Sequence, residues 1–565
     1  MMLKQISVLL IIFSFSIFRV SAQSAVTDDF LKGWHLKSKT KDGFAGINLE
    51  AAYEFLKDKK STTVIVAVID TGIDTLHEDL KSILWRNPKE IPGNRIDDDK
   101  NGYTDDIYGW NFLGGKDGRN VTEEAQEEAR IYHSLKEKYK NVQDESKLTP
   151  LEKEEYLIFI KAKNKLQTAA TDAQANMLFL RNLYKQSLLA DSILKEKFKL
   201  EYTGHELASF KPANSKEASA KATMITLFKG FEMLDAKNTT IIPEFTVYFK
   251  SQETKAEAFD TPPANNRQTI VKDNYTDFND RYYGNNDVMA NFPTHGTHVS
   301  GIIAAARNNG IGIDGVANNV KIMTLRVVPS GDEYDKDIAL SIRYAVNNGA
   351  QIINMSFGKD FSPHKKWVDD AIRYAQSKGV LLVHAAGNDG VNVDSTENYP
   401  NSNFADTKLK ASNYITVGAS GDKQTGGLIA NFSNYGKKEV DVFAPGVKIY
   451  STQPGGNAYN FSDGTSFSSP VVAGLAALIL SYYPTLSAEQ IKYCIEKGAE
   501  VQTEEVKKPG TEEQAPFNTF SKTGGLINAF ESIKIAASLK GERKMPLASK
   551  PLLTPKPKVK KTKKR

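Results

Sequence analysis

V-I-V-A-V-I-D-T-G-I-D at residues 64–74 decides the fold class of this 565-residue chain. The unbroken apolar run at 64–69 is typical of a strand in a parallel sheet that is covered on both faces. Asp70 stands at the carboxyl end of that strand, the edge at which open α/β sheets bind their ligands. The stretch therefore predicts a buried parallel strand that carries an acidic group to a candidate functional edge.

Two further segments carry groups that could act with this acid. P-T-H-G-T-H-V-S-G at residues 293–301 supplies His295, and the small residues after it could pack a helix closely against the sheet. D-G-T-S-F-S-S-P at 463–470 supplies Ser466, just before an apolar helical run at 471–480. The hydroxyl is thus predicted near a helix amino terminus, where developing negative charge is favoured.

An amide and the order of the motifs complete the pattern. H-A-A-G-N-D-G at 384–390 places Asn388 between the base and the nucleophile, and its amide could bind an oxyanion. Each motif alone is weak, because Asp at a strand end and Ser at a helix start are common capping features. Together, in the order acid, base and nucleophile, they resemble the subtilisin family of serine peptidases.

The resemblance implies a role for each of these groups. Ser466 would be the nucleophile, and His295 the base that takes its proton. Asp70 would accept the other imidazole N–H, while Asn388 and the backbone N–H of Ser466 would bind the oxyanion of the tetrahedral intermediate. We expect His298, the second histidine of H-G-T-H, to be structural.

Strand and helix patterns alternate between the base and the nucleophile. Right-handed crossovers would make the sheet mainly parallel, with helices on both faces. The predicted fold class is therefore α/β, a doubly wound, mainly parallel, subtilisin-like sheet with a helical insertion. The strands are expected at 321–328, 351–355, 380–384 and 414–417, and the helices at 337–347 and 367–377.

Segments beside these strands are similar to the substrate-binding parts of the family. One would pair with an extended substrate backbone by β-strand addition; it consists of Ser356, Phe357 and Gly358. Ala385 and Gly387 match the wall of the primary specificity pocket, and the alternative is an ordinary strand-to-loop turn. Asp389 lies near the pocket mouth in the family, so its carboxylate could favour a basic substrate side chain.

The acidic stretch at 97–106 predicts a calcium site. Oxygen-bearing side chains stand at positions one, three, five and nine of a loop with Gly102 at position six, which is the first part of a calcium loop. Tyr108 replaces the bidentate Glu at position twelve, so the loop is not an EF-hand, and the alternative is a solvated acidic turn. Since Cys494 is the only cysteine, no intrachain disulfide can form, and we expect a bound metal ion to stabilise the fold instead. The candidate ligands are Asp97, Asp99, Asn101, Tyr103, Asp105 and Asp106.

The two ends of the sequence differ in composition from the body. Residues 1–22 combine Lys4 with an apolar stretch and V-S-A, which predicts a secretory signal peptide and a secreted or periplasmic protein. Residues 537–565 hold eleven Lys or Arg and one Glu, which predicts a disordered basic tail that could bind an anionic envelope surface. Because the tail carries the basic excess, the body is acidic, and we expect no nucleic-acid partner.

The spacing of acid and base departs from the family. Asp70 and His295 are 225 positions apart, because a charged, helix-prone insertion at 120–273 separates them. This insertion could be a lid, an arm that binds a partner or a passive elaboration. Amphipathic helices are expected in it at 123–130, 151–163 and 175–185. The expected division is a signal peptide at 1–22, a catalytic domain at 23–119 and 274–536, the insertion at 120–273, and the tail at 537–565.

Taken together, the motifs predict a secreted serine endopeptidase that acts on proteins or peptides and holds structural calcium. One alternative keeps the chemistry but dedicates it to processing a single partner protein recruited by the insertion. A second is an inactive scaffold that binds peptides, because residue identity alone does not establish activity. The oligomeric state is not predicted.

Overall fold

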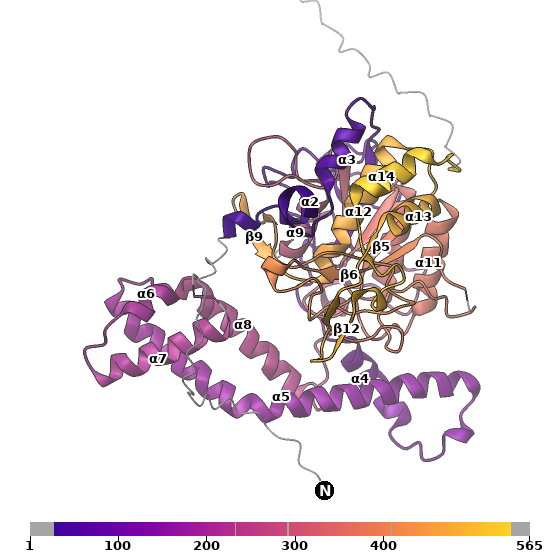
Figure 1. Ribbon diagram of the computed structural model, residues 1–565. Coiled ribbons are helices and arrows are strands. Elements are labelled where there is room, and N and C mark those ends of the chain that lie inside the picture. The colour runs from indigo at the N-terminus through magenta and orange to yellow at the C-terminus, as the bar shows by residue number, and fades with distance from the viewer. Residues whose placement is uncertain (1–27, 232, 235, 291–292, 408, 544–565) are drawn as a thin grey trace, which may run out of the picture.

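A computed structural model describes residues 28–231, 233–234, 236–290, 293–407 and 409–543. The predicted signal peptide at 1–22 lies outside these residues, as do positions 544–565 of the predicted tail. An α/β body is built round one large sheet, and an elongated helical arm projects from it (Figure 1). The arm is formed by the insertion.

The body is organised by a nine-stranded sheet in the order β10-β13-β7-β6-β5-β4-β1-β3-β2. Neighbouring strands are parallel except for the antiparallel pair β10 and β13. β1 lies between β3 and β4, at the centre of the parallel region. The strands are β1 Val64–Asp70, β2 Gly109–Asn111, β3 Val320–Arg326, β4 Ile352–Met355, β5 Leu381–Ala385, β6 Tyr414–Ser420, β7 Val442–Pro445, β10 Glu500–Val501 and β13 Gly525–Leu526.

Helices cover both faces of this sheet, which confirms the predicted fold class. Val66 and Val68 of β1 belong to one core cluster, whereas Ala67 and Ile69 belong to the cluster on the opposite face. Burial on both faces explains why the strand is an unbroken apolar run. The first cluster includes side chains of α3 Leu49–Leu56, α9 Thr294–Ala304, α12 Thr465–Tyr482, α13 Ala488–Gly498 and α14 Ala529–Ser538, and the second those of α10 Asp335–Asn347 and α11 Lys365–Ser377.

Shorter elements complete the body. Two antiparallel hairpins, β8 with β9 and β11 with β12, lie outside the main sheet. Among the described helices, α12 alone has the length and apolar composition to cross a membrane, and most of that stretch is buried inside the body. The remaining bounds are α1 Asp28–Leu31, α2 Lys39–Asp42, β8 Ile449–Gln453, β9 Ala458–Ser462, β11 Glu505–Lys507 and β12 Gln514–Pro516.

The insertion forms helices α4 to α8 and has an apolar core of its own. The predicted helices at 151–163 and 175–185 lie in one continuous helix, α5, which has no Gly or Pro after its first residue to end it. Thr149 begins α5 with a capping box. The predicted helix at 123–130 starts only at Glu127. The bounds are α4 Glu127–Tyr139, α5 Pro150–Lys197, α6 Gly204–Ser209, α7 Ser215–Gly230 and α8 Asn238–Glu257.

The carboxyl end of the body extends further than the sequence indicated. Helix α14 runs to Ser538, beyond the predicted start of the tail at 537. Arg543 then donates from Nε to the carbonyl of Leu486 at 2.9 Å and from Nη2 to that of Gly379 at 3.0 Å. These hydrogen bonds hold the chain against the body up to residue 543. Ala536 and neighbouring apolar residues of α14 are also buried in the core.

Candidate active site

Asp70 and His295 meet at the carboxyl edge of the sheet. The Nδ1 atom of His295 lies 2.7 Å from Oδ1 of Asp70, whose side chain is 1% exposed. The same carboxylate oxygen accepts the backbone N–H of Thr71 at 2.7 Å. Gly296 permits this approach, because a Cβ there would lie 2.2 Å from the carbonyl oxygen of Gly72. The small residue after the histidine is thus required by close packing of α9 on the end of β1.

The carboxylate sets the basicity of His295. Burial by itself lowers the pKa of the imidazole, but the charge of Asp70 and the hydrogen bond to it outweigh burial and raise the pKa above its usual value near 6.5. With Nδ1 facing Asp70, the second ring nitrogen, Nε2, is the one available to another group. Asp70 therefore increases the affinity of the His295 imidazole for a proton.

Ser466 is the second residue of α12, as His295 is the second residue of α9. Its Oγ donates to the carbonyl of Ser356 at 3.1 Å, and Ser356 Oγ in turn donates to the carbonyl of Ser466 at 2.7 Å. Phe467 lies beside the base, with its ring centre 5.4 Å from that of His295. Ser466 and His295 therefore lie near each other at the same edge, but the Ser466 hydroxyl points to the carbonyl of Ser356 in this structure.

Thr465 orients the amide of Asn388. The backbone N–H and the Oγ1 hydroxyl of Thr465 both donate to Asn388 Oδ1, each at 2.9 Å. Thr465 Oγ1 also accepts the N–H of Gly387 at 3.1 Å. Because the carbonyl edge of the Asn388 side chain is held in this way, its NH₂ group is the edge left to donate. Sequence reasoning did not single out Thr465, although it stands inside the G-T-S motif.

The predicted substrate segments lie round a cavity of about 290 Å³. Ser356 is not in its lining but contacts Ser466 directly. The walls hold four of the five predicted substrate residues together with the nucleophile and the amide, and they also include residues that sequence reasoning missed. The predicted ones are Phe357, Gly358, Ala385, Gly387, Asn388, Asp389 and Ser466, and the missed ones include Gln126, Lys165, Asp332, Asp360 and Asn398.

His298 is buried behind the site. Its Nε2 lies 3.1 Å from the carbonyl oxygen of Ile449, and its Nδ1 lies 3.1 Å from Nε2 of Gln453. Burial lowers the pKa of His298 to about 3, so the ring is neutral at ordinary pH. These contacts join α9 to the β8 hairpin and fit a structural role.

The acidic loop brings together only part of the predicted metal set. Carboxylate oxygens of Asp97 and Asp99 lie within 4.8 Å of each other and of one from Glu90, which precedes the loop and was missed in the sequence. Three converging carboxylates are a donor set of the kind that Ca²⁺ prefers. Glu90 Oε1 also accepts the N–H of Asp99 at 3.1 Å, which fixes its position beside the loop.

The other predicted ligands make different contacts. Asp105 accepts the N–H groups of Gly93 and Arg95 at 2.9 and 2.8 Å. Asp106 accepts from Asn87 and Asn101, and burial raises its pKa to about 6. The ring of Tyr103 packs in an aromatic cluster. Asp105 and Asp106 stand outside the group of converging carboxylates, whereas the backbone N–H of Asn101 donates to both Asp97 and Asp99.

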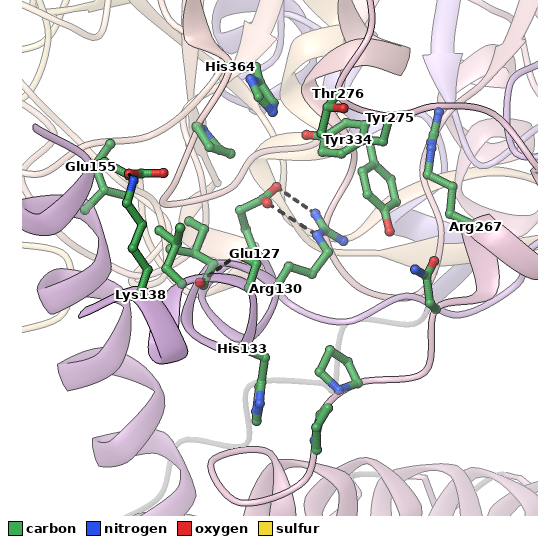
Figure 2. A pocket seen from close by; sticks show the side chains of 18 of the residues that line it. Glu127, Arg130, His133, Lys138, Glu155, Arg267, Tyr275, Thr276, Tyr334 and His364 are labelled. Carbon is green, nitrogen blue, oxygen red and sulfur yellow. Dashed lines mark hydrogen bonds and ion pairs between the residues drawn. The ribbon is translucent and has the colours of Figure 1, made fainter. Parts of the chain in front are cut away.

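A larger cavity, of about 840 Å³, lies between α4, the start of α5 and the α/β body (Figure 2). Glu127 and Arg130 form an ion pair of 2.7 Å in its wall. Its lining includes His133, Lys138 and Tyr275 but none of Asp70, His295 and Ser466. This cavity of the insertion is therefore separate from the candidate catalytic groups.

Asp70 and His295 are in contact beside the cavity that Ser466 and Asn388 line, so the groups singled out by the motifs come together in the fold. The sequence model of the subtilase family, Peptidase_S8, matches residues 61–520, and the chain belongs to this family. This confirms the resemblance found in the motifs.

Curated relatives align over about a third of the chain. A thermophilic serine proteinase of Bacillus sp. (strain AK1) is 43% identical over 188 residues, 33% of this chain and 42% of its own length. Subtilisin DY of Bacillus licheniformis is 41% identical over 35% of this chain and 67% of its own, and subtilisin E of Bacillus subtilis (strain 168) is 40% identical over 36% and 50%. The chain thus spans about half the length of the curated relatives it matches. A solved protease structure from Pseudoalteromonas arctica PAMC 21717 aligns over 89% of this chain and 96% of its own, at 20% identity and a TM-score of 0.45.

Proposed function

We propose that this protein is a serine endopeptidase that hydrolyses peptide bonds in proteins or peptides through an acyl-enzyme on Ser466. The observation that carries the proposal is the 2.7 Å contact of His295 with the buried Asp70, at the sheet edge that also holds Ser466 and Asn388. Membership of the subtilase family supports the same reaction.

The chain's own groups account for each step. The Ser466 side chain turns from the carbonyl of Ser356 to His295, its Oγ attacks the substrate carbonyl carbon, and its proton passes to Nε2. The amide of Asn388 and the backbone N–H of Ser466 donate to the oxyanion. As the C–N bond breaks, the imidazolium returns the proton to the leaving amine. Water, deprotonated by His295, then hydrolyses the ester and restores the Ser466 hydroxyl.

A fluorophosphonate probe tests the assignment. The folded wild-type protein is expected to be labelled on Ser466 and to hydrolyse a casein substrate, whereas Ser466→Ala should lose both properties. Ser395→Ala, at an exposed loop position outside the lining of the cavity, is the matched control and should keep both. Folded wild-type protein that takes no label and hydrolyses nothing would instead be the inactive peptide-binding scaffold.

We further propose a calcium ion on Glu90, Asp97 and Asp99, and export through the leader at residues 1–22. The converging carboxylates support the metal, since three negative charges so close together repel one another without a cation. The composition of the leader supports export. A calcium ion here would stabilise a chain that has no disulfide.

A further inference from the structure

The insertion contributes to the cavity beside Ser466. Gln126 precedes α4 and Lys165 lies on α5, and both line this cavity together with Ser466 and Asn388. The side chain of Lys165 is 40% exposed. Residues of the insertion, more than 300 positions before Ser466 in the sequence, therefore form part of the wall of this cavity.

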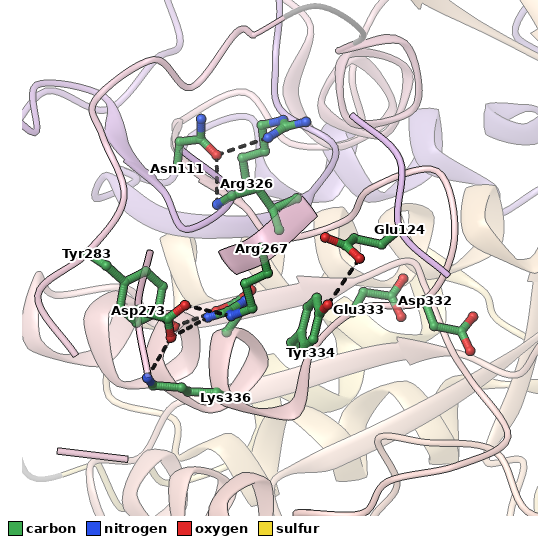
Figure 3. Close-up of polar contacts among 12 residues, drawn as sticks. Asn111, Glu124, Arg267, Asp273, Tyr283, Arg326, Asp332, Glu333, Tyr334 and Lys336 are labelled. Carbon is green, nitrogen blue, oxygen red and sulfur yellow. Dashed lines mark hydrogen bonds and ion pairs between the residues drawn. The ribbon is translucent and has the colours of Figure 1, made fainter. Parts of the chain in front are cut away.

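Buried ion pairs hold the insertion to the body. Arg267 donates to both carboxylate oxygens of Asp337 at 2.7 and 2.9 Å, and Asp273 accepts from Lys336 at 2.7 Å (Figure 3). These side chains are at most 4% exposed. Separating buried partners would leave uncompensated charges away from water, which is strongly unfavourable.

A second set of contacts lies closer to the cavity. Lys359, just after the segment predicted to bind substrate, pairs with Glu127 of α4 at 2.7 Å and with Asp335 at 2.9 Å. Phe361 packs with Ile131 of α4 and Ala162 of α5. With polar and apolar contacts on both sides, this part of the insertion is a fixed wall and not a free lid.

Negative charge exceeds positive charge round this wall. The ammonium group of Lys165 is already paired with Asp360 and lies 3.7 Å from Glu128, so two carboxylates face one cation. Lys359 and Arg130 both pair with Glu127, and Lys359 also pairs with Asp335, so two carboxylates balance these two cations.

Two carboxylates of the lining add to this excess. Asp332 is 9% exposed, and its Oδ2 accepts the N–H of Glu127 at 2.8 Å. Asp389 also lines the cavity.

We propose that the insertion and the body together form a subsite for a cationic group of the peptide substrate, and that Lys165 is a specificity-determining residue of this subsite. The group bound is an ammonium or a guanidinium, attracted by the excess of carboxylates. Lys165 limits the attraction, because its own charge opposes that of the ligand. This inference rests on the proposed endopeptidase function.

The test uses N-acetylated, internally quenched peptides of one sequence, with Arg, its neutral isostere citrulline, or Glu at each of the four positions before the scissile bond. Wild-type enzyme should show a higher kcat/KM for Arg than for citrulline at one position, and the lowest for Glu. Lys165→Met should raise the Arg-to-citrulline ratio about threefold to tenfold, as expected for removing one partly screened charge from the wall. Asp332→Asn should lower the ratio.

Lys161→Met is the matched control. Lys161 lies one turn earlier on α5 and is 52% exposed, but it pairs with Glu397 at 2.6 Å and is not in the lining of the cavity. The control should leave the ratio unchanged. Equal ratios for Lys165→Met and Lys161→Met, or no preference for Arg in wild type, would overturn the inference.

Further experiments identify which group of the substrate supplies the cation, and they separate a failure of this inference from a failure of the proposed function. A second set of peptides carries citrulline in place of Arg and begins one to four residues before the scissile bond. Comparing kcat/KM for free and acetylated amino termini shows whether the bound cation is the substrate's α-ammonium. Preference for the free terminus assigns the subsite to that ammonium; preference for Arg alone assigns it to a side chain. Hydrolysis without any cationic preference refutes only this inference, whereas a folded wild type that hydrolyses no peptide refutes the proposed function as well.

Discussion

Thr465→Val tests whether the amide of Asn388 is held in place by the residue before the nucleophile. The substitution nearly conserves the volume of a fully buried side chain but removes the hydroxyl that donates to Asn388 Oδ1 at 2.9 Å. The backbone N–H of Thr465 keeps its own 2.9 Å bond to the same oxygen. One of the two bonds that orient the amide is therefore lost, and the amide itself remains.

The contacts set the expected size of the effect. The lost hydrogen bond stabilises the orientation in which the Asn388 amide can donate, and one neutral hydrogen bond contributes about 0.5–1.5 kcal/mol. Its loss corresponds to a fall in kcat of roughly twofold to twelvefold. Asn388→Ala removes the donor itself and should cost about 10²–10³ in kcat, the cost known for this amide in a subtilisin. The N–H of Gly387 also loses its acceptor, which should lower the melting temperature by roughly 1–3 °C.

The assay is steady-state hydrolysis of one peptide by both variants, with melting curves alongside. Because the oxyanion is absent from the bound substrate and develops in the transition state, kcat should fall while KM changes little. Thr523→Val, which removes a hydroxyl bonded to the carbonyl of Asp441 at 2.9 Å, is the control and should leave kcat unchanged. A loss for Thr465→Val as large as that for Asn388→Ala, or an effect confined to KM, would refute the positioning role.

Three further predictions follow from the site. His295 must be neutral to act as a base, so kcat/KM should rise with pH through an apparent pKa above 6.5. Asp70→Asn should lower both this apparent pKa and the rate. An optimum near pH 4 would contradict the mechanism. Ser466→Ala and His295→Ala should each remove most activity, and a double mutant much slower than either would show that the two do not act as a unit. Calcium at a hundredfold excess over Kd should stabilise the Ser466→Ala protein by about 2.7 kcal/mol. Glu90→Gln should weaken the rise of the melting temperature with calcium, whereas the control Asp370→Asn on α11 should not. Identical melting curves in chelator and in millimolar calcium would contradict the calcium site.

Local patterns in the sequence were sufficient for the fold class and for the choice of candidate catalytic residues. The apolar run before Asp70 is continuous because β1 is buried on both faces, and this requirement can be seen in the residues themselves. The order of Asp70, His295 and Ser466 is likewise a property of the sequence. So is the Gly after His295, which the close approach of α9 to β1 requires.

Contacts between residues distant in the chain were decided by the tertiary structure. Glu90 joins Asp97 and Asp99 only because the chain folds back on itself, and Asp105 and Asp106 are drawn to backbone and amide donors instead. The sequence showed that 120–273 is helical, but not that α5 brings Lys165 to the cavity of Ser466. Hydrophobic periodicity reports which face of a helix is buried, not which neighbour covers it. That choice depends on the packing of the whole chain, and here it placed Lys165 of the insertion in the cavity beside Ser466.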